Sequence, residues 1–248
     1  MEKKEGIGMY KKIEKMCSMM EGKRHIVFFG GAGVSTESGL KDFRGENGLS
    51  HTAKRYTPEE ALSSRFFVQH TEEFFAYYRE NMLAQARPNF AHFALAKLER
   101  EGRLDGVITQ NIDGLHQMAG SRKVVELHGS VLRNYCTRCH TFYDVEKIKN
   151  EAVPLCGCGG VVKPDVVLYG ESLKEEDIES AAEMIERADL LIVGGTSLSV
   201  YPAAGFVQEY RGEMILINKT PTPMDERAEL LIPSPIGQVF RLLMGEDE

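Results

Sequence analysis

The chain has 248 residues, of which 42% are hydrophobic and 27% charged, a composition typical of a folded domain and not of a disordered segment. Its formal net charge of −7 and its pI of about 5.6 argue against nucleic acid or an anionic membrane as the main partner. No apolar run approaches the roughly 18 residues of a membrane span, and the charged N-terminus leads into no signal-peptide core.

The first expected element is an amphipathic helix over residues 10–22. Its apolar stripe consists of Ile13, Met16, Cys17 and Met20, and Gly22 follows as a stop signal. On this stripe Cys17 is expected to be a small buried hydrophobe and not a redox residue.

Residues 25–29 form an apolar run that predicts a buried strand ending in a glycine-rich turn. The turn, Gly30 to Gly33, lets the backbone approach a ligand and points free N–H groups at anionic oxygen. Ser35, Thr36 and Ser38 add hydroxyl donors just beyond it. The pattern predicts a phosphate-binding cradle, although these residues alone leave open a strand-to-helix turn that binds nothing.

The same turn differs from the ordinary dinucleotide fingerprint. Its spacing is G-A-G-x-S and not G-x-G-x-x-G, and no acidic residue ends a second strand roughly 20 residues later to hold a ribose. The region around Ala53 and Lys54 is instead polar and loop-like. A plain dehydrogenase is therefore a poor fit.

Helical segments are expected on both sides of residue 85. Thr57 is suited to be an N-cap, Pro58 occupies the first helical position, and Glu60 completes a capping box. From there to about residue 83 the segment is rich in aromatic side chains, which usually form core but can also wall a pocket. A further helix is expected over residues 88–101, where Gly102 ends it.

Strands alternate with helices or loops in the rest of the chain, and each ends in polar residues or glycine. They are expected at residues 106–109, 124–127, 165–169, 190–193 and 214–217. Apolar runs closed in this way are typical of a parallel sheet whose ligand crevice lies at the carboxyl ends of its strands. The sequence therefore predicts a doubly wound, Rossmann-like α/β domain.

A cysteine cluster interrupts this pattern between residues 128 and 165. Cys136, Cys139, Cys156 and Cys158 follow the spacing C-x2-C-x16-C-x-C, which is close to that of a zinc ribbon. Four thiolates close a tetrahedral site, so we expect one structural zinc ion that supplies much of the folding free energy of this segment. Unliganded cysteines, or His140 in place of one thiolate, are the alternatives. Reduced thiols also indicate a cytoplasmic location.

Six motifs of the chain, taken together, resemble those of one enzyme family. Residues 31–45, GAGVSTESGLKDFRG, resemble the signature G-A-G-x-S-x-x-S-G-I-P-D-F-R of the sirtuins, the NAD-dependent protein deacylases. The other motifs follow in the family order at residues 109–116, 126–130, 163–171, 195–202 and 217–219. Two departures are visible. Lys41 replaces a proline that would stiffen the loop, and the second cysteine knuckle is C-x-C where the family usually has C-x2-C.

The resemblance implies a single catalytic domain made of interleaved parts. A Rossmann-like part would comprise residues 1–40, 88–128 and 165–248, a helical module residues 41–87, and a zinc module residues 129–164, all approximately. The implied activity is NAD-dependent protein-lysine deacetylation, with release of nicotinamide and O-acetyl-ADP-ribose. A mono-ADP-ribosyltransferase, a deacylase for longer apolar acyl groups and a non-enzymatic zinc-ribbon module that senses NAD are the alternatives.

The resemblance also assigns roles residue by residue. His128 would be the general base, because a histidine with a pKa near neutrality can take a proton from a ribose hydroxyl after nicotinamide has left. Gln110 and Asn111 would hold that ribose and a bound water. The other residues that would bind NAD are Ala32, Thr36, Phe43, Arg44, Ile112, Asp113, Thr196, Ser197, Asn218, Lys219 and Ile236.

Substrate binding is expected at two segments that resemble those between which an extended peptide inserts as a third strand. They consist of Val167, Leu168, Tyr169 and Gly170, and of Ser199, Val200 and Tyr201. Main-chain hydrogen bonds give affinity in this mode with little demand on sequence, so we expect many acetylated proteins as substrates.

The acyl group itself is expected to be uncharged: acetyl, or a longer apolar group. Sirtuins that prefer succinyl or malonyl groups share a Tyr-x-x-Arg pair on a helix, and Phe75 and Tyr78 take those positions here. Arg79 lies one residue further on, rotated by about 100° around the helix, so it should point elsewhere. We therefore expect acetyl-lysine to be preferred over succinyl-lysine.

Overall fold

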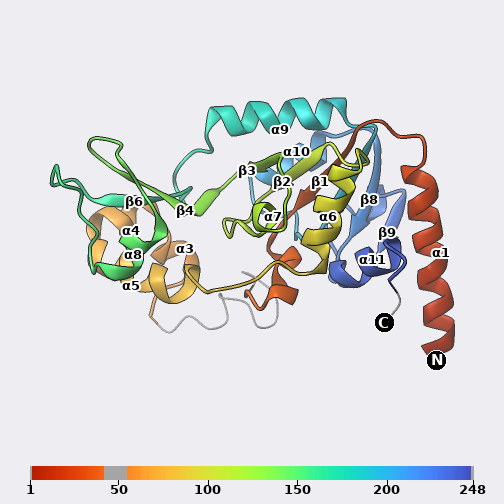
Figure 1. Cartoon of the computed structure of the whole chain (residues 1–248), viewed down its shortest axis with the longest axis horizontal. Coiled ribbons are helices and arrows are strands. Elements are labelled where there is room, and N and C mark those ends of the chain that lie inside the picture. Colours follow the sequence, from red (N-terminus) through yellow and green to blue (C-terminus); the bar gives the residue numbers. More distant parts are fainter. Residues whose placement is uncertain (1, 42–54, 247–248) are drawn as a thin grey trace.

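A six-stranded parallel sheet forms the centre of the larger of two lobes in the computed structural model, which describes residues 2–41 and 55–246 (Figure 1). Its strands, in spatial order, are β3 (Val124–Glu126), β2 (Gly106–Thr109), β1 (Ile26–Gly30), β7 (Leu190–Gly194), β8 (Glu213–Ile217) and β9 (Leu230–Ile232). All neighbours pair in parallel, and every residue of β1, β2 and β7 is buried. This confirms the doubly wound α/β fold expected from the apolar runs.

Helices cover both faces of this sheet. On one face lie α1 (Glu2–Met20), α6 (Phe90–Arg100) and α11 (Ile236–Leu243), and on the other lie α9 (Glu175–Arg187) and α10 (Ala203–Glu209). The short helix α7 (Leu115–Met118) follows β2, and single 3-10 turns occur at Ala32–Val34, Thr36–Ser38 and Asp225–Arg227. Each face buries its own apolar cluster, so the strands are shielded from water on both sides. Among the described residues no helix combines the length and apolarity needed to cross a bilayer.

The chain order of the strands reverses between β1 and β7. Ile26 pairs with Leu190 at one end of these strands, and Gly30 pairs with Gly194 at the other. Ligands of open doubly wound sheets bind at such a switch point, outside the carboxyl ends of the strands. The glycine-rich turn after β1 therefore lies where the fold class places a ligand.

The smaller lobe combines several helices with a second, antiparallel sheet. Its helices are α3 (Pro58–Ala61), α4 (Ser64–Gln69) and α5 (Thr71–Met82), and its sheet has the order β5 (Phe142–Tyr143), β4 (Gly129–Cys136) and β6 (Val162–Val166), with α8 (Val145–Asn150) between β5 and β6. Phe74, Phe75 and Tyr78 of α5 are fully buried in its core. Figure 1 shows β4 running from the main sheet into this lobe.

The capping box at the start of α3 is confirmed. Thr57 Oγ1 accepts a hydrogen bond from the Glu60 N–H at 3.2 Å, and the Glu60 carboxylate accepts one from the Thr57 N–H at 3.0 Å. The aromatic segment that follows is broken into α3, α4 and α5, because Ser63 caps α4 and ends the first helix after a single turn.

Two expectations from the sequence are wrong. Residues 165–169 do not add a strand to the parallel sheet, because β6 ends at Val166 and pairs antiparallel with β4. Its residues alternate between buried and half-buried, as in a sheet with one covered face. Cys17 is exposed, although Ile13 and Met16 on the same helix are buried as expected.

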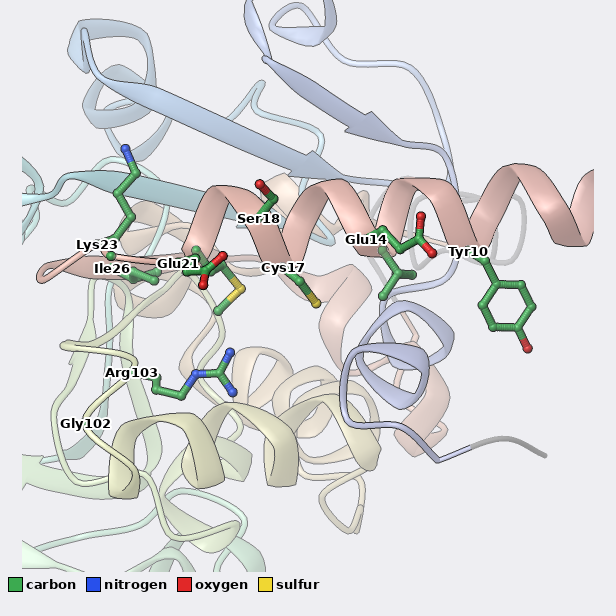
Figure 2. Close-up of a pocket in the computed structure, with 12 residues that line it drawn as sticks. Tyr10, Glu14, Cys17, Ser18, Glu21, Lys23, Ile26, Gly102 and Arg103 are labelled. Atoms are coloured by element: carbon green, nitrogen blue, oxygen red, sulfur yellow. The ribbon is translucent and has the colours of Figure 1, made fainter.

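The exposed Cys17 lines a groove of about 700 Å³ between α1 and the turn that precedes β2 (Figure 2). Glu14 of α1, Glu21 just after it and Arg103 of that turn also border this groove. Ile26, the first residue of β1, forms part of its wall. The groove therefore lies at the amino ends of the strands, away from the glycine-rich turn and the switch point.

Candidate active site and metal centre

The glycine-rich turn packs its bare backbone against the turn after β7. The Gly33 N–H donates to the Gly195 carbonyl at 2.8 Å, and a Cβ atom built on Gly33 would lie only 2.8 Å from the Gly195 Cα. A side chain at this position would push the two turns apart. The N–H groups of Gly31 and Gly33 both bond to carbonyls at and just after the end of β7, so they are not the free donors expected from the sequence. The absence of side chains is what lets the two turns meet at the switch point.

Ser35, just beyond this turn, joins two residues of the loop after β2. Its hydroxyl donates to Asp113 Oδ2 at 2.7 Å and accepts a hydrogen bond from Asn111 Nδ2 at 3.1 Å. Burial raises the pKa of Asp113, and the hydrogen bonds from the Leu115 N–H and the Ser35 hydroxyl oppose that rise. The amide and the carboxyl group are thus held in fixed orientations. The sequence predicted Ser35 only as a hydroxyl donor near the turn; it did not predict that Ser35 would connect Asn111 to Asp113.

Two buried histidines, His92 and His116, lie next to this cluster. His92 Nε2 lies 3.5 Å from Ser35 Oγ, and its Nδ1 lies 3.2 Å from the Asn89 backbone nitrogen and 3.0 Å from Asn89 Oδ1. The His116 ring lies 4.8 Å from that of His92, and neither of its nitrogens has a hydrogen-bond partner among the described residues. Burial lowers the pKa of His92 to about 4 and that of His116 to about 3, so both rings are neutral near pH 7.

His128 lies in the short connection between β3 and β4. Its Nδ1 lies 2.9 Å from the Gln110 carbonyl oxygen, which only accepts, so Nδ1 carries the proton and Nε2 is left with its lone pair. Burial lowers the pKa of His128 below its usual value, and the hydrogen bond to Gln110 opposes that shift only in part. The ring is therefore neutral near pH 7 and able to accept a proton at Nε2.

The remaining residues assigned to the NAD site lie mostly around the carboxyl ends of the main sheet. Gln110 Nε2 donates to Thr196 Oγ1 at 3.0 Å and so joins the ends of β2 and β7. Within their own loops, Thr36 donates to the Gly33 carbonyl, Ser197 pairs with Ser199, and Asn218 donates to the Thr220 carbonyl. Ala32 and Ile112 are half-buried, Lys219 is exposed, and Ile236 is buried at the start of α11. Phe43 and Arg44 lie outside the described residues.

The two segments assigned to peptide binding follow β6 and β7. The Val167 N–H donates to the His128 carbonyl at 3.0 Å, and the Tyr169 N–H and carbonyl bond to Leu62 and Ser64. The Glu171 carboxylate accepts from the Leu168 N–H at 2.9 Å and so fixes the bend of this segment. Tyr169 and Tyr201 expose 37% and 61% of their surface, so both segments reach the outside of the molecule.

The four cysteines meet at one point of the smaller lobe. Their sulfur atoms all lie within 4.8 Å of one another, and the Cys136–Cys158 and Cys139–Cys156 pairs are 3.5 Å apart. Four sulfurs at about 2.3 Å from a zinc ion stand about 3.8 Å apart, so the cluster fits one structural zinc. The C-x-C knuckle still reaches across to the first knuckle. The Tyr143 hydroxyl, 3.2 Å from Cys156 Sγ, adds the kind of outer hydrogen bond that orients metal ligands.

Comparison with known proteins identifies the family of this chain. The model of the Sir2 family matches residues 31–202. An NAD-dependent protein deacetylase of Clostridium tetani is 54% identical over 240 residues, which cover 94% of this chain and 97% of that protein. One of Thermotoga maritima is 40% identical over 95% of this chain and 98% of its own length. The structure of a Sir2 protein with a p53 peptide and NAD+ superposes with a TM-score of 0.86 at 39% identity, over 94% of this chain and 98% of that one. The chain belongs to the Sir2 family.

Proposed function

We propose that His128 is the general base with which this chain, an NAD-dependent protein deacetylase, removes acetyl groups from lysine side chains. The observation that carries this role is the hydrogen bond from Nδ1 to the Gln110 carbonyl, which fixes one tautomer. Nε2 is then the only ring atom that can take a proton. Because burial lowers the pKa of His128, this atom is unprotonated at neutral pH.

NAD fits the groups around the switch point. The bare glycine backbone beside Ala32 and Thr36 suits its phosphates, and the fixed Asp113 carboxyl group suits a carboxamide N–H. Bound NAD supplies an electrophilic ribose carbon when its nicotinamide leaves. We assign Gln110 and Asn111 to the nicotinamide ribose and Ile112 to the carboxamide. The residues that we assign to the remainder of NAD are Phe43, Arg44, Thr196, Ser197, Asn218, Lys219 and Ile236.

We assign the acetylated substrate to the segments 167–170 and 199–201, as an extended strand. The first of them is bonded to the backbone of the helical module through Tyr169 and to the general base through Val167. Main-chain pairing would place the acetyl-lysine of many different sequences in the same register. A related structure supports this assignment: a Sir2 protein bound to an acetylated peptide, which is 37% identical to this chain and superposes with a TM-score of 0.84.

The products of one incubation test the proposed function. Wild-type protein, NAD and an acetyl-lysine peptide should yield nicotinamide, O-acetyl-ADP-ribose and the deacetylated peptide, each identified by its mass. A protein that instead gained the mass of ADP-ribose would be a mono-ADP-ribosyltransferase. Unchanged NAD would indicate a module that senses NAD without consuming it.

The acyl preference follows from where Arg79 is bound. Its guanidinium donates to the carbonyls of Ile148, Glu151 and Ala152 at 2.7 to 3.3 Å, on the zinc side of the lobe. Phe75 and Tyr78, at the positions of the family's Tyr-x-x-Arg pair, are fully buried among aromatic rings. A carboxylate in this pocket would lose its water without gaining a fixed cation, at a cost of several kcal/mol.

We therefore expect kcat/KM to be roughly 100-fold higher for an acetyl peptide than for the same peptide carrying a succinyl group. A butyryl peptide is the control for size, because it carries an apolar chain of similar length into the same aromatic wall. Succinyl rates equal to acetyl rates would contradict the expectation and would show that a cation reaches the acyl group.

We also infer a cytoplasmic location, since free thiols persist in reducing compartments. The net charge of −7 supports acetylated proteins, and not nucleic acid or an anionic membrane, as partners.

A further inference from the structure

Strand β4 carries a bulge close to the general base. Ser130 pairs with Asp165 on β6, and Asn134 pairs with the adjacent Pro164, so residues 131–133 are extra on the β4 side. Bulges beside active sites commonly redirect a side chain or a stretch of backbone. Here the first two bulge residues contact the loop after β2, and the third binds carboxylates on β3 and β6.

The first two bulge residues contact the loop that follows β2. The Val131 N–H donates to the Ile112 carbonyl at 2.9 Å. Leu132 packs over Gly114, where an added Cβ atom would lie 2.6 Å from the Leu132 Cδ1. These contacts tie β4 to the loop that holds Asn111 and Asp113.

The third bulge residue, Arg133, binds two carboxylates from different lobes. Its Nη1 lies 2.6 Å from Glu126 Oε2 at the end of β3, and its Nε lies 3.0 Å from Asp165 Oδ2 on β6. The two carboxylates expose only 7% and 11% of their side-chain surface, so water competes weakly for them. Lys174 Nζ adds a second cation 2.8 Å from Asp165 Oδ1, which balances the charges of the cluster.

These ion pairs bracket the backbone link between the base and the peptide segment. Glu126 precedes His128 by two residues, Asp165 precedes Val167 by two residues, and the Val167 N–H donates to the His128 carbonyl at 3.0 Å. Arg133 ties the end of β3 to β6 next to this hydrogen bond, through its ion pairs with Glu126 and Asp165. A shift of either strand would move the base relative to the segment that carries the peptide.

We propose that Arg133 is a positioning residue, which sets His128 at the correct distance from acetyl-lysine on the segment 167–170. The proposal rests on the roles assigned above to His128 and to that segment. Because catalysis needs reacting groups placed to within about 1 Å, a loosened link should slow turnover more than it weakens ligand binding.

The test begins with Arg133→Met, which keeps the length of the side chain and removes its charge. We expect kcat/KM for an acetyl peptide to fall roughly 10- to 100-fold, mainly in kcat, with the Kd for NAD unchanged within twofold. Arg133→Lys should recover only part of the loss, because one ammonium group cannot span both carboxylates as a guanidinium fork does. Lys149→Met is the control, since it removes an exposed ion pair with Glu146 from the same lobe.

A double variant separates positioning from simple neutralisation of Glu126. Glu126→Gln with Arg133→Met removes both members of the pair and leaves no unpaired carboxylate at the end of β3. The proposal would be supported if the double variant had a higher Tm than Arg133→Met, close to that of wild type, but the same low kcat. Recovery of both would overturn it, as would an Arg133→Met enzyme whose kcat and KM stay within twofold of wild type. A wild-type protein that forms no O-acetyl-ADP-ribose would contradict the proposed function instead.

Discussion

Replacing His128 with alanine should lower the turnover of an acetyl-lysine peptide by roughly 10²-fold or more, the loss that follows removal of a general base. The fold should survive, because the ring is half-buried and makes a single hydrogen bond within the described part of the chain, to the Gln110 carbonyl. Turnover is measured as O-acetyl-ADP-ribose formed at saturating NAD, and circular dichroism checks the fold. Turnover within a few-fold of wild type would remove His128 from the mechanism.

The matched control for this variant is His70→Ala. His70 is an exposed histidine of the smaller lobe that pairs with Glu73 at 2.9 Å, so its loss should leave turnover unchanged. The pH profile gives a second check. Since burial lowers the pKa of His128 below 6.5, its base form persists as the pH falls through 6.5, and the acid limb of kcat/KM should lie below that value. This limb should disappear in the residual activity of His128→Ala.

Removing the metal should have the largest effect on stability. Cys136 and Cys156 are buried in the same apolar cluster as Phe74 and Tyr78, so the zinc site and the core of the smaller lobe form one unit. Structural zinc sites bind with apparent free energies on the order of 10 kcal/mol, which exceeds what so small a core can replace. We expect one zinc per chain by metal analysis, and strong chelation should lower Tm and activity together.

The double substitution Cys156→Ala, Cys158→Ala should behave like the chelated protein, because this knuckle supplies half of the ligands. Cys17→Ala is its control, since Cys17 is exposed on α1 and lies outside the cluster. Activity in a purified protein that contains no metal would contradict the structural zinc.

Local patterns predicted much of the main sheet. The apolar runs that became β1, β2 and β7 are buried along their whole length, so hydrophobicity alone marks them. The spacing of the cysteines predicted their meeting, because each knuckle is local and metal chemistry limits the outcome. The capping box at Thr57 could also be predicted from the sequence, since all its partners lie within four residues.

Features that depend on distant partners were not predictable in this way. Residues 165–169 resemble the other apolar runs, but β6 covers Val162–Val166, and only its pairing with β4 makes it antiparallel. The bond from Ser35 to Asp113 joins residues that no periodicity relates. The bulge that directs Arg133 onto Glu126 and Asp165 has no sequence signature, because it is defined by the register of two strands.

The pairing of β1 with β7 also has a consequence for how the protein is made. Ile26 pairs with Leu190, so the centre of the sheet cannot close until most of the chain has left the ribosome. At the usual 5–20 residues per second, synthesis from one strand to the other takes roughly 8–30 s. The cysteine knuckles emerge earlier and lie close together in sequence, so they can capture their metal while β1, an apolar strand that already has β2 available on one side, still lacks β7 on the other. During this interval the nascent chain exposes a segment that chaperones recognise, and translation speed becomes a determinant of folding yield.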